Sequence, residues 1–79
     1  MSSQHYDALI DARGLSCPMP LVKARQALMV LPAGATVAVL ATDPAAPRDF
    51  QEFADMTGHA LKEEREEGGI YWLVLVKAG

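Results

Sequence analysis

The residues best suited to chemistry lie in one short segment, from Gly14 to Pro20. Cys17 stands in its centre, and two prolines follow it, of which Pro18 is adjacent. Prolines are typical of the first turn of a helix, where backbone N–H groups have no intrahelical partner to lose. The N–H groups and the dipole of a helix start favour a negative charge. We therefore predict a thiol that reacts as a thiolate, with a pKa below the value of about 8.5 for a free cysteine.

Cys17 must act together with another molecule, because it is the only cysteine of the chain. A single thiol forms no internal disulfide, no C-x-x-C redox pair and no zinc site of the usual ligand count. The two histidines, His5 and His59, lie far from it in the sequence. The alternative is a buried structural cysteine, since free cysteine is among the most buried residue types. The loop position, the two prolines and the helix start favour the reactive interpretation, and Gly14 lets the loop fold back so that side chains do not cover the sulfur.

The residues after the cysteine predict a helix from Pro18 to about Leu31. Apolar residues recur there at steps of three and four, which places them on one face of a helix. The Pro-Ala-Gly sequence at 32–34 ends it. Before the cysteine, the stretch from Tyr6 to Ala12 is predicted to be a strand. The apolar stripe of the helix consists of Leu21, Ala24, Leu28 and Leu31.

A second helix is predicted between two strands. The apolar and β-branched run from Thr36 to Thr42 suits a well-buried strand. Asp43 is a candidate N-cap for the helix that follows and ends at Gly58, with Pro47 leaving the first helical residue open. The run from Ile70 to Lys77, rich in aromatic and β-branched residues, predicts the last strand. The apolar stripe of this second helix consists of Phe50, Phe53, Ala54 and Thr57.

The segment from Leu61 to Glu67 carries two opposed signals. Its Lys, Glu and Arg residues favour a helix, whereas Gly68 and Gly69 before a strong strand indicate a two-residue hairpin, which needs a partner strand. We predict a charged edge strand, because such a strand also discourages pairing with another sheet. The expected order is βαβαββ, an α/β (α+β) fold in which two helices cover one face of a four-stranded mixed sheet.

Length and charge limit the classes of function. A chain of 79 residues is long enough for one modest core, and we expect residues 1–79 to form a single domain with residues 1–6 flexible. The net charge of −3 argues against direct nucleic-acid binding. No apolar run approaches the roughly 20 residues that cross a bilayer, and the polar start from Met1 to Asp7 shows no secretory pattern. We therefore expect a cytoplasmic protein without a membrane partner.

The motif around the cysteine is part of a longer pattern. The pattern reads Asp11-x-x-Gly14-Leu15-x-Cys17-Pro18-x-Pro20 and Leu21-Val22, with Asp43-Pro44, Arg48-Asp49 and Gly58-His59-x-Leu61 further along. It resembles the signature of the TusA/SirA-like sulfurtransferase family, and the resemblance extends from about Asp7 to Lys77. The C-P-x-P motif is its most specific part. The resemblance implies a two-layer α/β sandwich and supports a strand at residues 59–67.

The resemblance also implies a function, that of a sulfurtransferase-type sulfur carrier. Members of this family accept sulfur as a persulfide on the cysteine that matches Cys17, and they pass it on for tRNA thiolation, molybdenum-cofactor assembly or sulfur oxidation. The expected partners are a cysteine desulfurase or rhodanese-type donor and a protein acceptor, with no metal or organic cofactor. Gly14, Pro18 and Pro20 support the site as motif residues. The alternative is a non-enzymatic module that serves regulation or a transporter.

Residues on the helix after the cysteine are candidates for partner docking. Arg25 lies two turns beyond Cys17, and Met19 and Val22 lie between them. Arginine and methionine are common at protein interfaces, although an ordinary solvated helix face is the alternative.

Three further charged residues lie near the site in the sequence or in the predicted turns. Arg13 could favour the thiolate by proximity, although exposed charges are screened by salt. Asp11 and Asp43 suit turn and capping roles better than acid–base roles.

Overall fold

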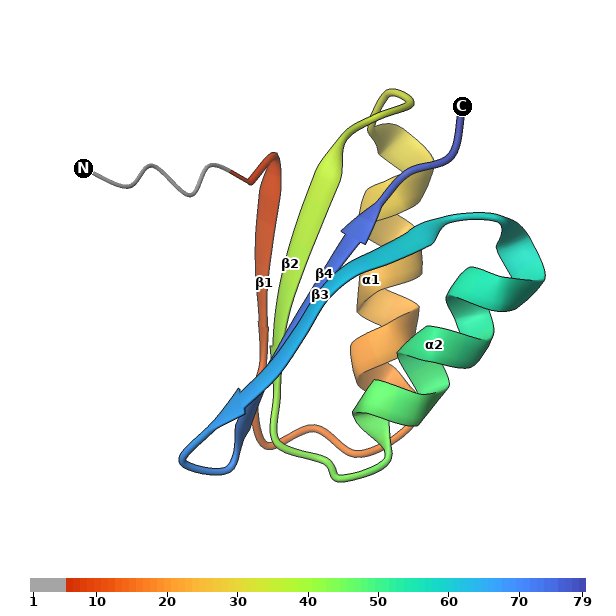
Figure 1. The fold of residues 1–79 in the computed structure, drawn as a ribbon. Helices are drawn as coiled ribbons and strands as arrows, with labels where there is room; N and C mark the ends of the chain where they lie inside the picture. The colour runs from red at the N-terminus through yellow and green to blue at the C-terminus, as the bar shows by residue number, and fades with distance from the viewer. Residues whose placement is uncertain (1–5) are drawn as a thin grey trace.

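The structure, a computed structural model, describes residues 6–79 (Figure 1). We expect residues 1–6 to be flexible, and residues 1–5 of this segment lie outside the described residues. No helix of the described chain is long and apolar enough to span a membrane. The order of the elements is the predicted βαβαββ: β1 (Ala8–Ala12), α1 (Met19–Val30), β2 (Thr36–Ala41), α2 (Ala46–Thr57), β3 (Ala60–Glu67) and β4 (Ile70–Val76).

The strands form one mixed sheet in the order β1-β2-β4-β3. β1 and β2 are parallel because α1 crosses between them, whereas β4 pairs antiparallel with both β2 and β3. α1 and α2 cover the same face of this sheet (Figure 1), so the predicted two-layer arrangement is confirmed. Because β1 and β2 are parallel, the β1–α1 and β2–α2 loops meet at the same end of the sheet. This end carries the cysteine.

β3 is a strand despite its helix-forming composition. Gly68 and Gly69 both have positive φ, 58° and 83°, which is the backbone of a tight hairpin turn and favours glycine. The turn pairs Glu67 with Ile70. The charged side chains of β3 lie on an edge of the sheet, where they discourage pairing with another chain. The strand predicted for Leu61 to Glu67 is therefore confirmed.

The core lies between the sheet and the two helices. α1 contributes the predicted stripe, in which Ala24 and Leu28 are buried while Leu21 and Leu31 pack half-buried against the core. From α2, Phe50 is fully buried. Burial of these apolar side chains on one face fixes how the helices sit on the sheet, and hence how their N-termini meet. The sheet contributes Ala12, Val37, Val39, Ala41, Leu73 and Leu75.

α2 begins differently from the prediction. Asp43 is not its N-cap, because that position is taken by Ala45, which makes no side-chain cap. Asp43 forms a turn instead: its Oδ1 accepts from the N–H of Ala45, and its carbonyl accepts from the N–H of Ala46, both at 3.0 Å. The turn satisfies two N–H groups ahead of the helix. It also leaves the other carboxylate oxygen of Asp43 available to the neighbouring β1–α1 loop.

Candidate functional site

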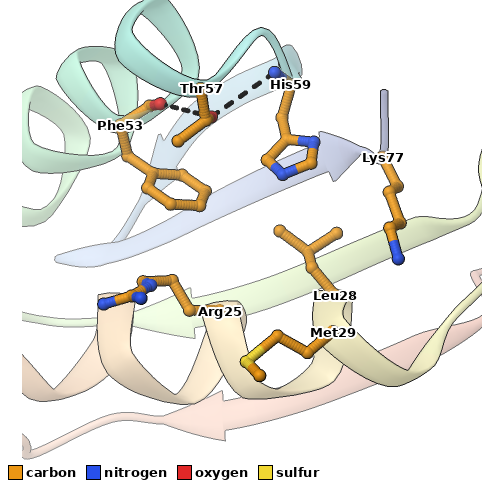
Figure 2. A pocket seen from close by; sticks show the side chains of 7 residues that line it. All are labelled: Arg25, Leu28, Met29, Phe53, Thr57, His59 and Lys77. Atoms are coloured by element: carbon orange, nitrogen blue, oxygen red, sulfur yellow. Dashed lines mark hydrogen bonds between the residues drawn. The ribbon is translucent and has the colours of Figure 1, made fainter. Parts of the chain in front are cut away.

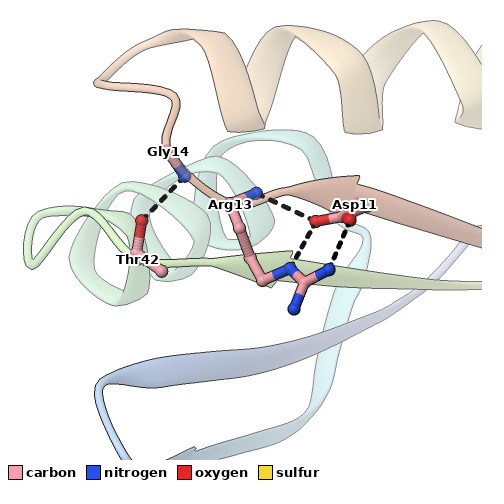
Figure 3. A network of polar contacts seen from close by, with 4 residues as sticks. All are labelled: Asp11, Arg13, Gly14 and Thr42. Carbon is pink, nitrogen blue, oxygen red and sulfur yellow. Dashed lines mark hydrogen bonds and ion pairs between the residues drawn. The ribbon is translucent and has the colours of Figure 1, made fainter.

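The loop that carries the cysteine is tied at its start to the end of β2 (Figure 3). The N–H of Gly14 donates to Oγ1 of Thr42 at 2.9 Å, and Gly14 has a φ of 82°, which favours glycine. Beside it, Asp11 accepts from the guanidinium of Arg13 at 2.8 and 2.7 Å and from its backbone N–H at 3.1 Å. These hydrogen bonds lower the pKa of Asp11 to about 2. The guanidinium of Arg13 is therefore held by Asp11 rather than by the thiol.

Cys17 is exposed and contacts two carboxylates of the β2–α2 segment. Its N–H donates to Oδ2 of Asp43 at 2.6 Å, and its thiol donates to Oδ2 of Asp49 at 2.7 Å. α1 begins at Met19 with Pro18 at the N-cap position, so Cys17 lies directly before the N-cap. The sequence placed the cysteine beside a helix start, and the structure confirms this position.

The electrostatics of the thiol are the reverse of the prediction. The pKa of Cys17 is raised above the ordinary value of a thiol, first by the hydrogen bond to Asp49, then by partial desolvation and by the charges of Asp49 and Asp43. The hydrogen bonds from the N–H groups of Ala45 and Cys17 lower the pKa of Asp43, which keeps its negative charge next to the loop. Two nearby carboxylates thus oppose the helix end, and the prediction of an acidified thiol is wrong for the free protein.

Asp49 is the residue that sequence reasoning missed. It lies in the first turn of α2, 32 positions after the cysteine that it contacts. Its carboxylate reaches Cys17 because the starts of both helices meet at one end of the sheet. The only signal in the sequence is the Arg48-Asp49 pair of the family pattern, which by itself indicates no contact with the cysteine.

The motif residues around the cysteine have different surroundings. Gly14 shapes the loop, and Pro18 is exposed at the helix start. Pro20 is buried in the first turn of α1. Both prolines lie against α2, where they border a small enclosed space together with Asp49 and Phe50. The prolines therefore pack the start of α1 against the start of α2, directly beneath the thiol.

An open cleft of about 430 Å³ runs from Cys17 between the two helices. Of the three candidate docking residues, Arg25 lines this cleft together with the cysteine. Met19 is 43 % exposed and Val22 is half-buried, and neither is among the lining residues. The structure therefore places one of the three in the cleft that Cys17 also lines. The other residues of the cleft are Pro18, Leu21, Asp49, Glu52, Phe53, Met56 and Thr57.

The cleft continues into a second hollow of about 450 Å³ farther along the helices (Figure 2). Arg25, Phe53 and Thr57 line both, so the two form one groove between α1 and α2. At its far end the polar side chains serve the fold: Nδ1 of His59 accepts from the N–H of Ala78 at 2.9 Å, and Nζ of Lys77 donates to a backbone carbonyl of α1's C-cap at 2.6 Å. Within residues 6–79, no three His, Cys, Asp or Glu side chains gather as metal ligands do.

Comparison with known proteins gives consistent matches over nearly the whole chain. Residues 8–77 match the family described as Sulfurtransferase TusA. The chain is 40 % identical over 73 residues to the sulfur carrier protein TusA of Allochromatium vinosum, covering 92 % of this chain and 96 % of that protein. It is 41 % identical over 69 residues to the TusA of Pseudomonas putida, covering 85 % and 86 %. The crystal structure of a SirA-like protein from Desulfitobacterium hafniense superposes with a TM-score of 0.79 at 28 % identity, covering 91 % of this chain and 99 % of that one.

Proposed function

The chain belongs to the sulfurtransferase TusA family and is a sulfur carrier, and we propose that it carries the sulfur as a persulfide on Cys17. The observation that supports this assignment is that the chain's single cysteine is exposed at the mouth of the groove between α1 and α2. A partner can therefore reach the sulfur from solvent. In this proposal Gly14, Pro18 and Pro20 hold the loop and the helix start that present it.

Loading and release follow from the chemistry of thiols and persulfides. The sulfur of Cys17 bonds to the outer sulfur of a donor persulfide, the S–S bond of the donor breaks, and its electron pair stays on the donor cysteine. The thiol proton of Cys17 ends on that leaving sulfur, so donor persulfide plus carrier thiol give donor thiol plus carrier persulfide. Release is the same exchange with an acceptor thiol, and its rate depends on the access and reactivity of that thiol.

The partners that fit this cycle are proteins with reactive cysteines. We infer a cysteine desulfurase or rhodanese-type donor and a thiol-bearing protein acceptor, without direct nucleic-acid binding or a membrane partner. The single domain of residues 1–79 would act in the cytoplasm, in a relay that serves tRNA thiolation, molybdenum-cofactor assembly or sulfur oxidation. The net charge of −3 and the exposed single thiol support protein rather than nucleic-acid partners.

Mass spectrometry tests the persulfide directly. After incubation with a cysteine desulfurase and cysteine, or with a rhodanese and thiosulfate, the intact protein is expected to gain the mass of one sulfur atom. Peptide mapping should place that atom on Cys17, and a reducing thiol should remove it. Protein first alkylated with iodoacetamide is the control and should gain nothing. If neither donor adds sulfur to Cys17, the persulfide proposal is wrong.

Arg25 supplies a test of the docking surface. Arg25→Glu is expected to slow transfer from the Cys17 persulfide to a confirmed acceptor about tenfold, because it removes the guanidinium that lines the cleft and with it the direct contact that an acceptor would make there. Lys23→Glu is the matched control: it makes the same charge change on an exposed position of α1 outside the groove. The measurement is the second-order transfer rate at low salt. Equal rates for both variants would place docking elsewhere, on Met19 and Val22 or on the β2–α2 loop.

A further inference from the structure

Asp49 is the side chain that directly contacts the reacting sulfur. Its Oδ2 accepts the thiol hydrogen of Cys17 at 2.7 Å. The backbone of Asp49 is fixed by the helix, since its N–H donates to the carbonyl of Ala45 at 3.0 Å. Its side chain is half-buried, borders the open cleft, and lies over the enclosed space next to Phe50. The carboxylate is therefore held in place, and any partner that reaches the sulfur must meet it.

The charges around the thiol are mostly negative. Asp43 lies on the β2–α2 loop, and Asp49 and Glu52 lie on α2, facing the cleft or the loop beside it. Among the described residues that line the cleft or the enclosed space beside it, Arg25 on α1 is the one cation. Three carboxylates and one guanidinium give the mouth of the cleft a net negative charge. An incoming group at the sulfur is therefore favoured when it is positively charged.

We propose that Asp49 determines which partner sites Cys17 reacts with. In the free carrier its carboxylate keeps the thiol in the protonated form. In the complex the carboxylate pairs instead with a basic side chain that the partner carries next to its own reactive cysteine. In this scheme the free carrier is slow towards unrelated electrophiles. A partner with a lysine or arginine beside its cysteine neutralises the carboxylate, and Cys17 is then released as the nucleophile. For sulfur transfer itself the inference rests on the proposed persulfide at Cys17.

The transfer conserves atoms, electrons and protons when the partner supplies the cation. The basic side chain pairs with the Asp49 carboxylate, and the thiol hydrogen bond to that carboxylate is lost. The sulfur of Cys17 bonds to the outer sulfur of the donor persulfide, while the donor S–S bond breaks with its electron pair on the donor cysteine. The proton that leaves Cys17 ends on the donor sulfur. No oxidant or reductant is consumed.

Small disulfides of different charge test the inference without any partner protein or persulfide. Each reacts with the Cys17 thiolate to give a mixed disulfide and one released thiol. Cystamine is cationic, 3,3′-dithiodipropionate is anionic and hydroxyethyl disulfide is neutral. At low salt the wild-type protein is expected to favour cystamine over the anionic disulfide by about tenfold or more. The preference should shrink as salt screens the charges.

Asp49→Asn is expected to reduce that cationic preference at least about threefold, because the nearest negative charge is gone. It should also raise the rate of alkylation by iodoacetamide at neutral pH by about threefold. Removing the carboxylate charge increases the fraction of thiolate. This gain is only partly offset, because the nucleophilicity of a thiolate falls with the pKa of its thiol, with a Brønsted coefficient of about 0.4–0.5. Asp49→Glu should keep the preference, because it restores the charge. Asp55→Asn is the matched control: it removes the same charge from an exposed position of α2 where the carboxylate contacts Gln51.

Several outcomes overturn the inference. It is wrong if Asp49→Asn keeps the wild-type preference, if Asp55→Asn loses it equally, or if the wild type favours the anionic disulfide. Thermal unfolding of each variant shows whether the fold is kept, and Asp49→Ser, which also removes the charge, replaces the Asn variant in the comparison if that variant unfolds. The disulfide assay is independent of the persulfide. A wild-type protein that shows the charge preference but never takes up sulfur would contradict the proposed persulfide and leave the role of Asp49 standing.

Discussion

Replacing Cys17 by serine is expected to reduce sulfur transfer to the background rate of the mixture without the carrier. A serine hydroxyl is far less acidic than a thiol and forms no persulfide, so the step that holds the sulfur between donor and acceptor is lost. The residue is exposed, and an exposed substitution of this size changes stability by only about 0.5 kcal/mol. The measurement is the passage of labelled sulfur from donor to acceptor, with thermal unfolding recorded beside it.

Ser16→Ala is the matched control, because it changes the exposed neighbouring side chain and leaves the thiol in place. It should transfer sulfur at the wild-type rate. The same pair of variants separates the carrier from a non-enzymatic module in cells. If Cys17→Ser retained the cellular role of the protein, that role would not depend on the thiol, and a regulatory or transporter-associated module would be the better explanation.

The fold could be predicted because its signals are local. The spacing of Ala24 and Leu28 fixes one buried helix face. At β3 the composition favours a helix, yet the turn at Gly68 and Gly69 makes the segment a strand. A tight turn with positive φ commits the chain to a hairpin, and the pairing of β3 with β4 then outweighs the weak preference of each charged residue for a helix.

The site could be predicted only in part, because half of it is distant in sequence. The motif identifies Cys17 and its position before α1. The sign of the pKa shift depends on Asp49 and Asp43, which come from another loop and helix and act at hydrogen-bond distance. Reasoning from the helix dipole alone includes the local N–H groups and omits these two charges. The sequence favours turn and capping roles for Asp43, and the structure shows the turn, but it also shows a contact that no local pattern predicts: the second carboxylate oxygen accepts from the N–H of Cys17.

Phe50 connects the stability of the fold with the geometry of the site. Its ring is fully buried between α2 and the sheet, and it borders the enclosed space beneath the thiol together with Pro18 and Pro20. It follows Asp49 directly in α2. The packing of this one ring therefore sets the position of the helix turn that holds the carboxylate against the sulfur. A cavity at this position would affect both stability and site.

Phe50→Ala is expected to lower the free energy of unfolding by about 3–5 kcal/mol, the usual cost of removing a buried aromatic ring. For a chain of this length the total is about 4–12 kcal/mol, so the substitution removes between about a quarter and all of the stability. Urea denaturation measures the loss. Met56→Ala, on the same helix but 86 % exposed, is the control and should change stability by no more than about 0.5 kcal/mol.

Phe50→Leu, which keeps most of the buried volume, should lose less stability and remain folded. The rate of its alkylation by iodoacetamide then reports whether the contact between Asp49 and Cys17 has loosened. Equal stabilities of Phe50→Ala and Met56→Ala would show that the ring does not support this end of the fold.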